Sequence, residues 1–164
     1  MRNVGSLKVD TSGDREIVMT REFHAPRRLV FDALIKPALI QRWMLGPPGW
    51  SMPVCEFQAK VGASYRFVWR NDSDGSEMGM GGVVREIVPG EKLVATEKFD
   101  QPWYPGEAVV THSLVEKDGK TTLTMTIRYP SREARDTALQ SPMEQGVAAG
   151  YDRLEQVLAA IPTR

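Results

Sequence analysis

Hydrophobic and polar residues alternate with a period of two over much of the chain, which is the pattern of half-buried β-strands. The alternation begins near residue 16, where Ile17, Met19 and Phe23 share one parity between polar neighbours. Six further stretches with strand character follow, at roughly residues 51–59, 65–70, 77–88, 93–99, 107–116 and 120–129. Asp118-Gly119 separates the last two and is a strong hairpin turn signal. The pattern therefore predicts seven antiparallel strands.

Other segments repeat apolar residues at helical spacing. The first follows Pro26 and is divided at Pro37 into two short helices, because proline cannot continue a helix but is tolerated in its first turn. A short helix over residues 131–139 precedes a long amphipathic one over residues 142–160. The two short helices thus lie between strands 1 and 2, and the long helix ends the chain.

Glycines occur in two places where they change the expected packing. Gly79, Gly81 and Gly82 fall inside a strand pattern, which indicates a bulge or the close approach of a neighbour. Gly146 and Gly150 fall on the apolar stripe of the long helix, where we expect them to leave space beneath it.

A predominantly antiparallel sheet with its helices on one face is an α+β fold. The arrangement predicts a helix grip, a curved seven-stranded antiparallel sheet wrapped around the long C-terminal helix. Residues 1–13 are expected to be a flexible N-terminal tail. Residues 14–164 are expected to form a single domain, since they contain no repeat, linker or low-complexity segment.

Composition excludes several classes of function. Lys plus Arg and Asp plus Glu each number 21 of 164 residues, and this balance argues against a nucleic-acid partner. Cys55 is the one cysteine and there are two histidines, so we expect no disulfide, metal site or cofactor. Without an apolar leader or a run of about 18 apolar residues, we expect no membrane association and a cytoplasmic location.

Short motifs occur in a characteristic order along the chain. They are Arg21 to Pro26, Val30 to Ala33, Trp43 with Gly46-Pro47, Val61-Gly62 before Tyr65-Arg66-Phe67, Gly82 to Pro89 leading into Lys92-Leu93-Val94, Glu133 to Asp136, and Gly146 through Gly150 to Leu154. Together they resemble the activator of Hsp 90 ATPase homologue (AHSA-type) family, which belongs to the SRPBCC group with START lipid-transfer domains, birch-pollen-type allergens and polyketide cyclases. The resemblance spans about residues 14–161 and supports the helix-grip fold.

This resemblance implies an internal cavity between sheet and helix, and aromatic and methionine side chains suit an adaptable apolar pocket. The candidate lining residues are Trp43, Tyr65, Phe67, Trp69, Met80, Trp103, His112, Leu123, Met125, Met143, Val147 and Tyr151. The alternative is that these residues fill an ordinary core.

A few polar residues could act inside such a cavity. His112 shares the parity of apolar neighbours and could orient a ligand or transfer protons, although a histidine satisfied by a core hydrogen bond is the more common case. Arg21 could hold an anion or reach solvent, and Glu107 and Tyr129 are weaker candidates of the same kind. Cys55 is interpreted as a small buried hydrophobe. We assign no catalytic residue.

Three functions remain open at this stage. The first is a binding module for a small hydrophobic or amphipathic molecule, without chemistry. The second is an enzyme like the polyketide cyclases or aromatases, which needs a titratable group within hydrogen-bond reach of its substrate. The third is an Hsp 90-type co-chaperone module, which needs an exposed interaction patch. The free edges of the sheet would also allow a homodimer.

Overall fold

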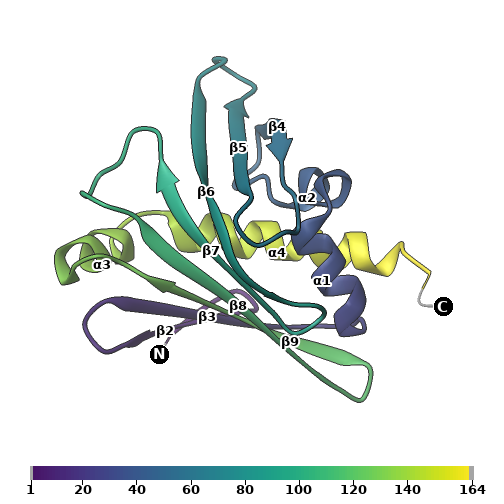
Figure 1. Ribbon diagram of the computed structural model, residues 1–164. Coiled ribbons are helices and arrows are strands. Elements are labelled where there is room, and N and C mark those ends of the chain that lie inside the picture. The colour runs from purple at the N-terminus through teal and green to yellow at the C-terminus, as the bar shows by residue number, and fades with distance from the viewer. Residues whose placement is uncertain (1, 163–164) are drawn as a thin grey trace.

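The structure, a computed structural model, describes residues 2–162 as one large antiparallel sheet with helices against it (Figure 1). The strands are β1 (Arg2–Val4), β2 (Leu7–Ser12), β3 (Glu16–Phe23), β4 (Trp50–Glu56), β5 (Ser64–Asn71), β6 (Glu77–Val88), β7 (Lys92–Phe99), β8 (Ala108–Lys117) and β9 (Lys120–Arg128). The helices are α1 (Arg27–Ile35), α2 (Pro37–Trp43), α3 (Arg132–Leu139) and α4 (Met143–Ala159).

The strands follow the order β1-β2-β3-β9-β8-β7-β6-β5-β4, so the pairing of β3 with β9 joins the N-terminal strands to the rest of the sheet. Figure 1 shows α4 crossing one face of the curved sheet, with α1 and α2 near one of its ends and α3 near the other. The α+β class, the long C-terminal helix and the two short helices between the first expected strand and the next are confirmed. No helix within residues 2–162 is long and apolar enough to cross a membrane.

The expected count of seven strands is wrong, because the described residues form nine. Both additional strands, β1 and β2, come from the segment expected to be a flexible tail. β2 pairs antiparallel with β3 from Lys8 opposite Thr20 to Ser12 opposite Glu16. Leu7 and Val9 are 1% and 2% exposed and belong to the core. Residue 1 of the expected tail and residues 163–164 of the expected domain lie outside the described residues.

The turn between β8 and β9 has the predicted chemistry. Asp118 and Gly119 both have positive φ, at 54° and 78°, as a two-residue hairpin turn requires. The resulting register places Leu114 opposite Leu123 and His112 opposite Met125. The hairpin therefore brings these four side chains into adjacent rows on one face of the sheet.

The helix glycines have a different role from the expected one. At Gly150 a Cβ would lie 3.3 Å from the carbonyl oxygen of Trp43, and at Gly146 it would lie 3.8 Å from Pro47 Cδ. Both glycines thus face α2 and the loop that follows it, whereas the sequence predicts that they leave space beneath the helix. The absence of a side chain at Gly150 lets α2 and α4 approach each other closely.

Arg21 on β3 forms polar contacts that link α4 to the sheet. Its Nη1 donates to the carbonyl oxygen of Tyr151 over 3.1 Å, and its Nη2 lies 3.4 Å from Asp152 Oδ1. The guanidinium also stands 4.6 Å from the ring centre of Phe23. Arg21 therefore acts as a structural link to the helix, with both Nη groups directed at α4.

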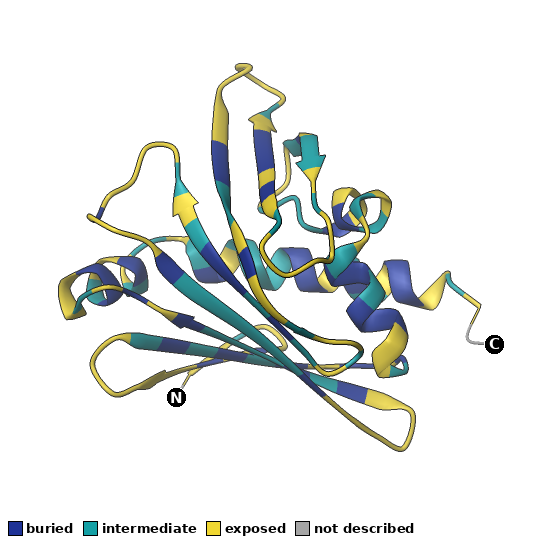
Figure 2. Ribbon diagram, viewed as in Figure 1, coloured by how far each residue is buried: buried dark blue, intermediate teal, exposed yellow. Residues whose placement is uncertain are grey.

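The buried residues, dark blue in Figure 2, form two apolar clusters. The main cluster joins β2, β3, β8 and β9 to α1, α3 and α4, and includes Leu123 and Tyr151. The second cluster joins β4, β5 and β6 to α2, and includes Tyr65 and Phe67. β7 contributes Leu93 to the main cluster and Ala95 to the second. The inner face of β7 is therefore where the two clusters meet.

Candidate functional site

The side chains that face α4 from the central strands define what we call the inner face. Successive residues of a strand point to opposite sides, so Ala95 and Glu97 of β7 share the side of buried Leu93. On β8, Val110 and His112 share the side of buried Leu114. The register joins them in rows across the sheet, with Ala95 beside Val110 and Leu93 beside His112.

The structure divides the expected cavity residues between the two clusters. Trp43, Leu123 and Tyr151 are buried in the main cluster, with Met125, Met143 and Val147 packed against it. Tyr65, Phe67, Trp69 and Met80 form the wall of the second cluster. Trp103 lies in the loop after β7, is 42% exposed and contacts Phe99 in a tilted arrangement, with ring centres 5.0 Å apart. Their role in holding a ligand stays a prediction.

Part of the inner face is not fully covered. Val110, His112 and Met125 keep intermediate exposure, although Val84 and Ile127 in the neighbouring positions are only 1% and 4% exposed. On the helix side, Met143 and Val147 are also of intermediate exposure. Central strands under a close-packed helix would bury these apolar side chains completely. The sheet and α4 thus leave accessible surface between them.

Glu97 lies at the end of this surface nearest the loop that follows β7. Its exposure is intermediate, yet the surrounding protein desolvates the carboxyl and raises its pKa from 4.5 to about 7. Its charge in turn adds to the effect of burial in raising the pKa of Tyr65, Tyr104 and Tyr129. The charge of this carboxyl therefore acts on three tyrosines, whose hydroxyls stay protonated.

A glycine lets Tyr65 reach across the sheet toward Glu97. Tyr65 on β5 pairs with Gly82 on β6, and its hydroxyl donates to the carbonyl oxygen of Thr96 on β7 over 2.5 Å. A Cβ at Gly82 would lie 2.6 Å from the Thr96 carbonyl carbon and closer still to its oxygen. The close approach expected at the strand glycines is thus confirmed. It places the Tyr65 hydroxyl at the Thr96 carbonyl, next to Glu97 in the chain.

His112 is the second ionisable residue of the inner face. Burial lowers the pKa of its imidazole from 6.5 to about 4, so the ring is neutral at physiological pH. Its Nδ1 is buried and has no hydrogen-bond partner among the described residues. The core hydrogen bond expected for an inward histidine is therefore missing at this nitrogen.

Glu97 is the inner-face residue that the sequence did not identify. The alternation Leu93, Ala95, Glu97 places it inward, but a carboxylate near a strand end is usually read as solvated. Of the weaker candidates, Glu107 is exposed and forms an ion pair with Arg85 at 3.6 Å, and its charge adds to the rise in the pKa of Tyr65. Cys55 is only partly buried and packs against the second cluster, where desolvation raises the pKa of its thiol to about 11.

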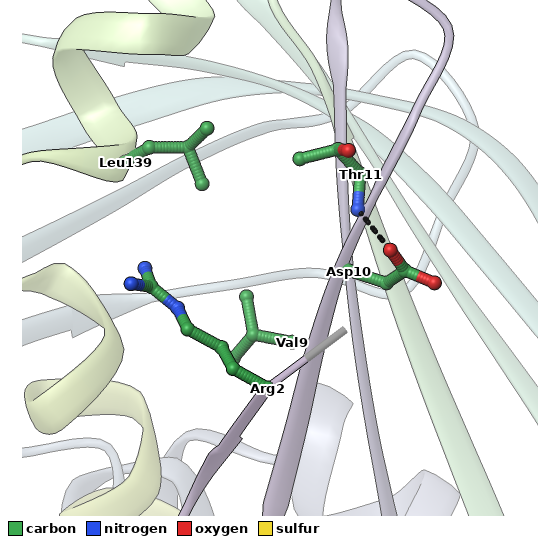
Figure 3. A pocket seen from close by; sticks show the side chains of 5 residues that line it. All are labelled: Arg2, Val9, Asp10, Thr11 and Leu139. Carbon is green, nitrogen blue, oxygen red and sulfur yellow. Dashed lines mark hydrogen bonds between the residues drawn. The ribbon is translucent and has the colours of Figure 1, made fainter.

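The surface also carries an open hollow of about 400 Å³ between β2 and the end of α3 (Figure 3). Arg2, Val9, Thr11 and Leu139 contribute to it, and Asp10 turns its carboxylate away to accept the Thr11 N–H over 2.8 Å. No expected cavity residue lines it. Within residues 2–162, no three His, Cys, Asp or Glu side chains are grouped so as to hold a metal ion.

Glu97 and His112 are expected to give the free energy of unfolding opposite pH dependences. The folded state keeps the Glu97 proton up to about pH 7, whereas the unfolded chain loses it near pH 4.5. The contribution of Glu97 to the free energy of unfolding is therefore full below pH 4.5 and is lost as the pH rises to 7. Folded His112 stays neutral down to about pH 4, so its contribution is full above pH 6.5 and is lost as the pH falls.

Urea unfolding between pH 4.5 and 6.5 checks this with two single variants. Over this range, Glu97→Gln should shift the slope of stability against pH to a more positive value than in the wild type. His112→Gln should shift the same slope to a more negative value. Equal slopes in the two variants would contradict the enclosed positions of these groups.

Comparison with known proteins gives one family and many similar folds. The family described as Activator of Hsp90 ATPase homolog 1-like protein matches residues 24–159. A crystal structure of a Rhodobacter sphaeroides protein has a TM-score of 0.89 and 30% identity, covering 96% of this chain and 100% of that one. An AHSA1 protein from Silicibacter pomeroyi has a TM-score of 0.72 and 20% identity, covering 88% and 97%. The search of curated proteins gives no match.

Proposed function

Because the chain belongs to the family of Activator of Hsp90 ATPase homolog 1-like proteins, we propose that it binds a small hydrophobic or amphipathic molecule between its sheet and α4. Domains of this family generally bind small hydrophobic ligands. The observation that carries the proposal is the accessible part of the inner face, where apolar Val110 and Met125 are left incompletely covered.

The ligand site has an apolar middle and polar ends. Ala95 and Val110 lie side by side at its centre, Glu97 lies toward one end and His112 toward the other. Small-molecule sites usually have a few polar groups among many apolar ones. Burial of apolar surface holds the ligand, and the polar groups orient it. Trp103 and Phe99 stand near the loop after β7, where we place the entrance.

Filling the space tests the proposal directly. Val110→Phe should change the free energy of unfolding by less than about 1 kcal/mol, because the larger ring enters accessible space. The same variant should release any molecule that native mass spectrometry finds on the wild type, and should weaken binding of the fluorescent probe N-phenyl-1-naphthylamine. Thermal unfolding and probe titration measure the two effects.

Val84→Phe is the matched control. Val84 lies in the same cross-strand row, opposite Ala95, but is only 1% exposed. The same added ring should therefore cost about 1–3 kcal/mol through overpacking. Equal destabilisation by both variants, with no probe bound by the wild type, would show that the inner face is a closed core and would overturn the proposal.

A further inference from the structure

Glu97 has no partner for its charge within the protein. Its carboxylate forms no hydrogen bond or ion pair with another residue of the described chain, and no basic side chain there lowers its pKa. The Glu97 carboxylate oxygens have no partner among the described residues, yet they are not among the polar atoms that are both unpartnered and fully buried. They therefore border accessible space. An enclosed carboxylate without a counter-ion is costly, and a ligand with a positive charge would relieve that cost.

The tyrosines around Glu97 do not neutralise it by hydrogen bonding. The Tyr65 hydroxyl donates to the Thr96 carbonyl, and the Tyr129 hydroxyl lies 3.7 Å from Met143 Sδ. The rings of Tyr104 and Tyr129 pack edge to face against each other, with centres 5.6 Å apart at an interplanar angle of 83°. The Glu97 carboxylate therefore stays without a partner among apolar neighbours, and an ammonium group would compensate its charge.

The inner face beyond Glu97 suits an apolar chain of limited length. Glu97 is opposite Ala108, and His112 lies four residues further along β8. At about 3.3 Å per residue this separates the two positions by about 13 Å. Ala95 and Val110 are the side chains between them, and neither can bond a polar group. The site therefore has one anionic end and an apolar body that ends at a neutral imidazole.

We infer that the ligand is an amphipathic amine, whose ammonium group pairs with the Glu97 carboxylate. Its apolar chain follows Ala95 and Val110 toward His112. The inference rests on the proposed function and adds the chemical class of the ligand. A fatty acid of the same length is disfavoured, because its carboxylate would meet a second negative charge at Glu97 or an uncharged His112.

Three molecules with the same ten-carbon chain test the inference by isothermal titration calorimetry at pH 8. The wild type should bind decylamine about 10–100-fold more tightly than 1-decanol, as a hydrogen bond to a charged group implies, and should bind decanoate most weakly. Glu97→Gln should bring decylamine and 1-decanol to similar affinities while leaving 1-decanol binding unchanged. Glu107→Gln, which removes an exposed carboxylate beside Ala108, should keep the wild-type preference.

A second measurement needs no variant. At pH 6 the free Glu97 carboxyl is mostly protonated, and pairing with decylamine should release about one proton. Burial keeps Tyr65, Tyr104 and Tyr129 protonated and His112 neutral at that pH, so they contribute no proton. Titrations in two buffers with different ionisation enthalpies measure the release.

The possible failures are distinguishable. Equal affinity for decylamine and 1-decanol in the wild type, or no proton release at pH 6, would overturn the amine inference and leave ligand binding standing. Failure of all three molecules to bind would overturn the inference together with the proposed function for chains of this length.

Discussion

Gly82→Ala is expected to lower the free energy of unfolding by about 3–5 kcal/mol. The new Cβ would overlap the Thr96 carbonyl, a backbone group that cannot rotate away. β6 and β7 would have to separate, which breaks the hydrogen bond from the Tyr65 hydroxyl to that carbonyl and the one from the Val83 N–H to Thr96 Oγ1. Denaturant unfolding monitored by tryptophan fluorescence measures the loss.

Gly146→Ala is the control for this prediction. A Cβ there would have 3.8 Å to its nearest neighbour, an ordinary contact, and the residue lies within α4. Alanine should therefore stabilise the domain by about 0.5–1 kcal/mol through its higher helix propensity. If Gly82→Ala behaved like Gly146→Ala, the close approach of β6 to Thr96 would be wrong.

Leu7→Ala is expected to cost about 2–5 kcal/mol, as removal of a fully buried leucine does. Leu7 is 1% exposed in the main cluster, although it belongs to the segment that the sequence predicts to be a tail. The substitution leaves a cavity beneath β2, whose place at the sheet is fixed by its pairing with β3. Thermal and urea unfolding of the purified variant check the size of the effect.

Lys8→Ala, one residue further, is the matched control. The side chain of Lys8 is exposed on the opposite face of β2, so its removal should change stability by no more than about 0.5 kcal/mol. A tail without structure would tolerate both substitutions equally. Equal and negligible effects of Leu7→Ala and Lys8→Ala would therefore contradict the presence of β2 in the sheet.

The two N-terminal strands were missed because their local signal is weak. β1 has only three residues, and in β2 just Leu7 and Val9 alternate with polar neighbours before Asp10-Thr11-Ser12. Period-two alternation needs a longer stretch than that to be recognised. What orders the segment is its pairing with β3 and the burial of two side chains by residues far along the chain.

The polar part of the candidate site was predicted only in part. His112 was selected because its parity placed it inward, and the structure puts it on the inner face. Glu97 has the same parity signal, but only the fold brings Tyr104 from a loop and Tyr129 from the position after β9 within reach of its charge. Enclosure of a carboxylate depends on residues that are distant in sequence, so no local pattern could reveal it.

The sequence by itself determined the order of strands and helices from β3 onward, the hairpin turn at Asp118-Gly119 and the family. These follow from local alternation, turn chemistry and short motifs. The tertiary structure decided that residues 2–12 join the sheet, that the helix glycines face α2, and that Glu97 lacks a counter-ion. Each of these depends on which distant surfaces meet, because burial and pairing are properties of the packed chain.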